Sequence, residues 1–75
     1  MTNLYIINEV LFDYTPGMAV IAAPNLERCR DIFGEKFDAP GEMEEYDYAI
    51  ENNIFKVIEG VNHNEGVVSY VYGGG

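Results

Sequence analysis

The sequence is poor in the residues on which disulfide, metal and thiol chemistry depend. Among its 75 residues it has one cysteine, one histidine and no tryptophan. One cysteine excludes an internal disulfide, and together with one histidine it leaves no Cys/His cluster of structural-zinc spacing. No catalytic or cofactor motif stands out. We therefore expect no bound metal, no cofactor and no enzymatic activity.

Basic residues are also scarce. Four Lys and Arg stand against thirteen Asp and Glu, which gives a formal net charge of −9. Direct binding to nucleic acid or to an anionic membrane is disfavoured, because both attract basic surfaces. A basic protein partner is favoured, since long-range attraction would speed its capture. The alternative is that the acidity only keeps a small protein soluble.

Long apolar runs are missing as well. No stretch approaches the roughly 18 apolar residues of a membrane span. The first three residues are uncharged, and Asn8, Glu9 and Asp13 interrupt the apolar segment that follows, which argues against a signal peptide. The length predicts a single domain, residues 1–75, with a thin core. A reducing, cytoplasmic location fits the lone cysteine best.

The pattern of apolar residues predicts a hairpin that runs into a helix. Strands over residues 4–12 and 18–23 would be joined by a turn over residues 13–17, in which Pro16-Gly17 suits the turn geometry. Side chains alternate between the two faces of a strand. One face of the first strand would carry Leu4, Ile6, Val10 and Phe12. The other face would carry Tyr5, Ile7 and Leu11. Because both faces are partly apolar, this strand is either central or meets a partner with one face.

A helix from Leu26 to about Phe37 follows. Asn25 is a suitable N-cap, and apolar residues recur with helical spacing. Cys29 lies on this apolar stripe, so core packing is its expected role. Gly34 is expected to weaken the last turn.

The second half of the chain is more ambiguous. Residues 42–52 fit one side of a short helix, which we prefer, but also one side of a strand. Strands are expected over residues 54–59 and 67–72, separated by a turn in which His63 is a surface residue. The final Gly73-Gly74-Gly75 is expected to be a flexible tail.

This order, ββα(α)ββ, predicts an α+β fold. It is a two-layer sandwich of a four-stranded, mainly antiparallel sheet with one main helix packed on one face. If the last two strands lie outermost, their free edges invite pairing with another chain. A homodimer, or a structural subunit that self-associates through sheet edges, is therefore one alternative for the function.

A run of acidic residues between the two halves is the candidate site. It contains no EF-hand spacing, so a metal site is not predicted. A row of carboxylates can imitate a phosphate backbone or block a groove lined with Arg and Lys, and interleaved tyrosines make good interface anchors. The predicted protein-binding residues are Glu42, Glu44, Glu45, Tyr46, Asp47, Tyr48 and Glu51.

The terminal Gly73-Gly74-Gly75, placed directly after a strand, resembles the ends of ubiquitin-like proteins and of small sulfur carriers. That resemblance implies a β-grasp layout and a terminal carboxylate that an activating enzyme adenylates. The chain departs from it in having three glycines and in Tyr72, which directly precedes them.

The opening segment resembles small phage-encoded anti-CRISPR proteins of the type I-F inhibitor set. The similarity rests on Tyr5-Ile6-Ile7-Asn8-Glu9-Val10, Ile21-Ala22 and Asn25-Leu26-Glu27, and covers the first third to half of the chain. It implies a small inhibitor that acts in the host cytoplasm by occluding a nucleic-acid-binding surface. We therefore expect an acidic, protein-binding inhibitor, with the carrier and the self-associating subunit as alternatives.

Overall fold

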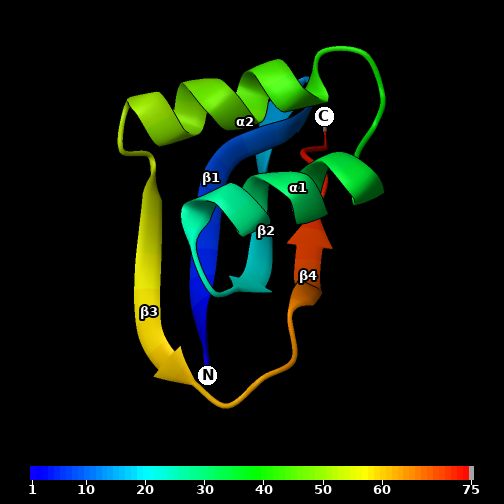
Figure 1. Cartoon of the computed structure of the whole chain (residues 1–75). Coiled ribbons are helices and arrows are strands. Elements are labelled where there is room, and N and C mark those ends of the chain that lie inside the picture. The colour runs from blue at the N-terminus through cyan, green and yellow to red at the C-terminus, as the bar shows by residue number, and fades with distance from the viewer. Residues whose placement is uncertain (75) are drawn as a thin grey trace.

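Four strands form one antiparallel sheet, and two helices cover one of its faces (Figure 1). The computed structural model describes residues 1–74. The elements are β1 (Thr2–Asp13), β2 (Thr15–Ala23), α1 (Leu26–Lys36), α2 (Glu42–Glu51), β3 (Phe55–Val61) and β4 (Gly66–Val71). The spatial order β3-β1-β2-β4 puts the last two strands outermost. The predicted α+β sandwich is confirmed, and residues 42–51 are helical.

The turn of the first hairpin is tighter than predicted. β1 and β2 remain paired as far as Asp13 and Thr15, and the chain reverses at Tyr14, whose φ is 68°. The reversal thus falls within the predicted turn, residues 13–17, but Pro16 and Gly17 belong to β2 and do not form the turn itself. Gly17 serves close packing instead, since an added Cβ would overlap the carbonyl oxygen of Val71.

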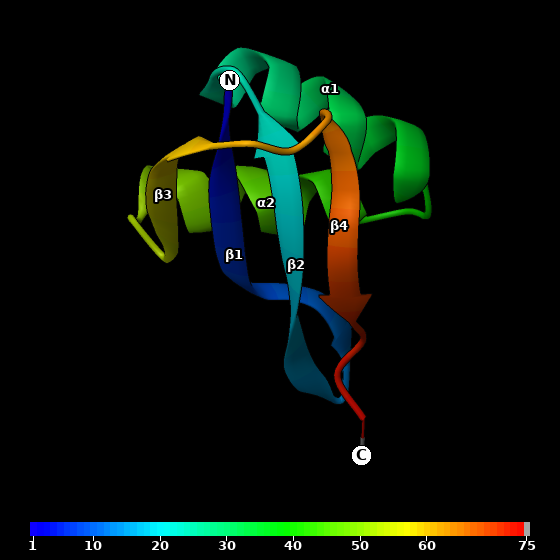
Figure 2. The same cartoon turned by 90° about the horizontal axis from the view of Figure 1, so that it is seen from below.

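Two irregularities in β1 change which side chains are buried. Glu9 and Leu11 have positive φ angles of 58° and 54°, and the register with β2 shifts at both places. Such bulges bend a strand and redirect its side chains. Val10 is consequently fully buried, whereas the even alternation had placed it with Leu4 and Ile6, which are only partly buried. Figure 2 shows the bend in β1.

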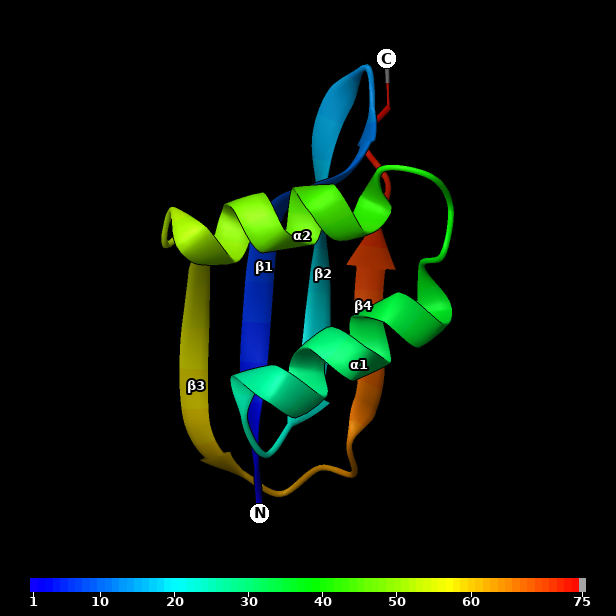
Figure 3. The ribbon, with the colours of Figure 1, turned by 45° about the horizontal axis from the view of Figure 1, so that its top comes forward.

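The two helices fill the layer above the sheet. Both lie on the same face, α1 against β2 and β4 and α2 against β1 (Figure 3). The side chain of Asn25 caps α1 by accepting a hydrogen bond of 2.8 Å from the backbone N–H of Arg28. Gly34 does not end α1. It faces α2, and an added Cβ would make an ordinary contact of 3.4 Å with the sulfur of Met43. No helix in residues 1–74 is long and apolar enough to cross a membrane.

The C-terminal glycines are held against the hairpin. The backbone N–H of Gly73 donates to the carbonyl oxygen of Leu11 at 3.0 Å, and Gly73 is buried. The N–H and C=O of Gly74 both bond to the hydroxyl group of Thr15, at 2.9 and 3.0 Å. The predicted flexible tail is thus wrong for Gly73 and Gly74, and Gly75 lies outside the described residues.

Candidate functional site

The seven predicted binding residues all lie on α2, but they point in different directions. Glu42 is buried at the start of the helix, where its carboxylate accepts hydrogen bonds from the backbone N–H of Ala39 at 3.1 Å and from the hydroxyl of Tyr72 at 2.9 Å. The side chain therefore ties the start of α2 to the segment that follows β4. This corrects the assignment of Glu42 to the binding surface.

Tyr46 is part of the core. Its ring lies 4.8 Å from that of Phe33 between centroids, and burial raises the pKa of its hydroxyl far above the ordinary value. Its assignment to the binding surface is likewise corrected. Met43 and Ile50, three residues before and four residues after it, share its side of α2 and pack against the same core.

Removing the hydroxyl of Tyr46 should stabilise the protein slightly. The oxygen is buried beside the Cys29 thiol, which is a weak hydrogen-bonding group, and within residues 1–74 it makes no hydrogen bond of good geometry. A buried polar group without a partner costs about 1–3 kcal/mol, so Tyr46→Phe should raise the free energy of unfolding by about 1 kcal/mol. Urea denaturation followed by circular dichroism measures this. A clear loss of stability would show that the hydroxyl is hydrogen-bonded in solution.

Asp47 and Glu51 point away from the other acids. Asp47 receives two hydrogen bonds of 2.9 Å from the guanidinium of Arg30, which hold the pKa of its carboxyl below the ordinary value. The pair joins α2 to α1 and largely neutralises this carboxylate. Glu51 is exposed at the far end of α2, beside a shallow depression that Leu26 and Glu27 also line.

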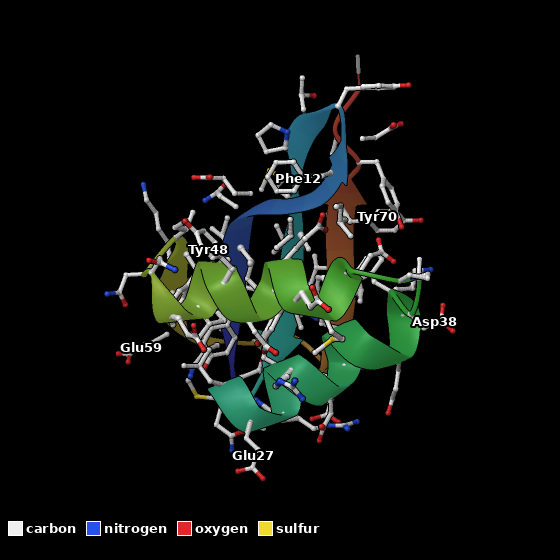
Figure 4. All side chains as sticks on the ribbon, turned by 90° about the horizontal axis from the view of Figure 1, so that it is seen from above. Phe12, Glu27, Asp38, Tyr48, Glu59 and Tyr70 are labelled. Carbon is white, nitrogen blue, oxygen red and sulfur yellow. The ribbon has the colours of Figure 1, made fainter. Side chains whose placement is uncertain are left out.

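The other three predicted residues of α2 line a hollow together with β1. Glu44, Glu45 and Tyr48 meet Glu9 and Phe12 of β1 around a depression of about 430 Å³ at the start of α2. We call these five residues the acidic hollow. Phe12 and Tyr48 are 46% and 60% exposed, and Figure 4 shows both on the hairpin side of α2. Within residues 1–74, one polar contact crosses the hollow: the backbone N–H of Phe12 lies 3.5 Å from a carboxylate oxygen of Glu45.

Within residues 1–74, no basic side chain balances the negative charge of the acidic hollow. No lysine or arginine of residues 1–74 lines it. Two of the four basic residues are engaged elsewhere: Arg28 lies 2.9 Å from Glu65 and 3.9 Å from Glu35, and Arg30 binds Asp47. Three neighbouring carboxylates beside two exposed aromatic rings can attract and hold a basic group.

Sequence reasoning missed Glu9 and Phe12, because they lie thirty or more positions before α2. The one signal was the imperfect alternation of the first strand, in which Glu9 interrupts the apolar pattern. The bulges at Glu9 and Leu11 are what turn this part of β1 toward the helix layer.

A larger hollow of about 610 Å³ lies between α1 and β4, and its charges are balanced. Arg28 and Lys36 line it together with Glu35 and Glu65, and the ammonium group of Lys36 lies 5.3 Å from the ring centroid of Tyr70. This balance gives no preference for a basic or an acidic ligand.

The single cysteine lies in the core and the single histidine at the surface, as the sequence predicted. Cys29 is buried on α1, and burial raises the pKa of its thiol, which lowers its reactivity. His63 is exposed, with its Nδ1 atom 2.6 Å from the carbonyl oxygen of Asn64. Within residues 1–74 no group of three or more His, Cys, Asp or Glu side chains is placed to hold a metal ion.

Comparison of the chain with protein-family models, with curated proteins and with solved structures found no significant match. The acidic hollow is therefore interpreted from its own chemistry.

Proposed function

We propose that this protein is a small inhibitor that binds a basic, nucleic-acid-binding surface of a partner protein through the acidic hollow. The observation that carries the proposal is the uncompensated cluster of Glu9, Glu44 and Glu45 around Phe12 and Tyr48. A surface that binds nucleic acid presents Arg and Lys to phosphates, and such side chains would meet carboxylates here instead.

The two kinds of side chain in the hollow have different effects on binding. The carboxylates, together with the net charge of −9, accelerate encounter with a basic surface and favour it over other partners. The exposed rings of Phe12 and Tyr48 supply apolar area that can be buried, and aromatic residues are enriched among the residues that dominate binding energy. The resemblance of the opening segment to phage anti-CRISPR inhibitors supports a host defence complex as the partner to test first.

The carrier alternative has less support. A carrier must present its terminal carboxylate to an activating enzyme, whereas Gly73 and Gly74 are hydrogen-bonded to Leu11 and Thr15. The carrier would have to release this segment before every reaction.

Reversing the charges of the hollow should weaken partner binding strongly. We expect Glu44→Lys combined with Glu45→Lys to weaken binding by at least tenfold, or about 1.4 kcal/mol, because lysines would face the basic residues of the partner. Immobilised wild-type and variant protein would be incubated with extract of the source cells, and the retained proteins identified by mass spectrometry. The specific partner should be a nucleic-acid-binding protein that competing DNA releases.

The control variant carries Asp31→Lys and Asp38→Lys, which change the net charge by the same amount. Both residues are exposed on or just after α1, and Asp38 lies away from Phe12 and Tyr48 (Figure 4). The control should retain the partner. Equal retention by both variants, or equal loss from both, would contradict a role for this particular hollow.

A further inference from the structure

The face of the sheet opposite the helices is apolar although, in residues 1–74, no helix or strand covers it (Figure 2). Directly paired residues point to the same side of a sheet, so the registers identify this face. Leu4 pairs with Ala22 and Ile58, and Ile6 with Val20 and Lys56. We call the following set the open face: Leu4, Ile6, Asn8, Met18, Val20, Ala22, Lys56, Ile58, Ser69 and Val71.

The open face is not built like a surface that faces water. A sheet covered on one side normally presents polar residues on the other. Here six of the ten positions hold large apolar side chains, and Ile58 and Val71 are 48% and 58% exposed. Contiguous apolar patches of this kind are typical of interaction surfaces.

Acidic residues are absent from the open face. The chain has thirteen Asp and Glu, yet none occupies any of the ten positions, and Lys56 is the one charged residue there. A basic partner would find no carboxylate to pair with on this face. A second copy, by contrast, could approach without bringing its acids into contact, in spite of the net charge of −9.

The size of the face fits a weak dimer interface. Strands lie about 4.8 Å apart and rise about 3.3 Å per residue, so the part of the four-stranded sheet that carries the open face spans roughly 20 × 16 Å, or about 300 Å². This is less than the roughly 800 Å² per partner of a stable interface and is typical of a transient one, which predicts a measurable equilibrium between monomer and dimer. Two sheets packed about 10 Å apart would enclose a second core between them.

We propose that the open face binds a second copy of this chain, giving a two-fold symmetric dimer in which the two sheets pack face to face. The same patch on both copies is self-complementary, as a two-fold interface requires. This dimer differs from the edge-to-edge pairing expected of exposed strands, because β3 and β4 keep free edges in it. It also leaves the acidic hollow of each copy accessible, so it does not depend on the proposed function.

Sedimentation equilibrium of the full chain tests the dimer. Measurements should span about 1 μM to 1 mM protein, the range in which weak to moderate interfaces dissociate. We expect a monomer–dimer equilibrium that strengthens between about 0.05 and 0.5 M salt, since salt screens the repulsion between two acidic chains. A monomer throughout this range, also at high salt, would overturn the proposal.

Two neighbouring residues of β3 provide a matched pair of variants. Ile58 lies on the open face, whereas Val57 pairs with Tyr5 on the helix side and is 40% exposed. Ile58→Glu should weaken dimerisation at least tenfold, and Val57→Glu should leave it unchanged. Val71→Glu, on the opposite edge strand, should act like Ile58→Glu, with circular dichroism confirming that every variant is folded. A dimer that survives both open-face variants would mean that the copies meet elsewhere, and that result would also overturn the proposal.

Discussion

Replacing Phe33 by alanine should remove a large part of the folding stability, about 3–5 kcal/mol. Phe33 is fully buried on α1, and its ring lies 4.8 Å from those of both Phe37 and Tyr46 between centroids. Truncating a buried phenylalanine costs about 3–5 kcal/mol. A 75-residue domain has about 4–11 kcal/mol of stability in all, so the loss removes a large part of it.

The size of the effect follows from how the helices are held. Phe33 connects α1 to α2 through Tyr46, and Phe37 continues the cluster to Tyr70 of β4, with 5.2 Å between ring centroids. No disulfide supports this layer, since the chain has one cysteine. The loss of one ring should therefore loosen both helices together.

The control is Phe12→Ala, which removes a ring of the same size from an exposed position. It should cost less than about 1 kcal/mol of folding stability, in line with other surface substitutions. Urea titration followed by far-ultraviolet circular dichroism measures both variants. Comparable losses for Phe12 and Phe33, or a Phe33 variant as stable as wild type, would contradict the described packing.

A single methyl group at Gly73 should also destabilise the protein strongly. A Cβ at this position would overlap the carbonyl group of Thr15, a backbone atom that cannot move aside as a flexible side chain can. Overpacking typically costs about 1–3 kcal/mol, and we expect Gly73→Ala to fall near the upper end. In a domain of this size, a loss of 2 kcal/mol lowers the melting temperature by roughly 10 °C.

Gly74→Ala is the matched control, because an added Cβ at Gly74 meets nothing within 4 Å. Differential scanning calorimetry should show a melting temperature close to that of wild type for this variant. If neither substitution had an effect, the glycines would form a free tail in solution. That outcome would favour the carrier interpretation over the inhibitor.

The local pattern predicted most of the fold. Asn25 followed by a helically spaced apolar stripe marks the start of α1, and β-branched runs mark β3 and β4. These signals depend on neighbours within a few residues, so they can be read along the chain. The sequence pattern of residues 42–51 fitted both a helix and a strand. In the structure this segment is a helix, and its residues Tyr46 and Ala49 pack in the core.

The glycines show where local interpretation failed. Pro16-Gly17 has the composition of a turn, and Gly73 that of a loose tail, yet both glycines lie where two segments about 56 positions apart pass too closely for a side chain. Sequence spacing carries no information about such a contact.

Composition and periodicity therefore determined the α+β class, the helix and strand order and the excess of acid. The tertiary structure alone decided which acids act together. It buried Glu42, paired Asp47 with Arg30, and joined Glu44 and Glu45 to Glu9 and Phe12. The physical reason is that secondary structure arises from neighbours along the chain, whereas a binding surface arises from segments that the bulges of β1 and the packing of α2 bring together in space.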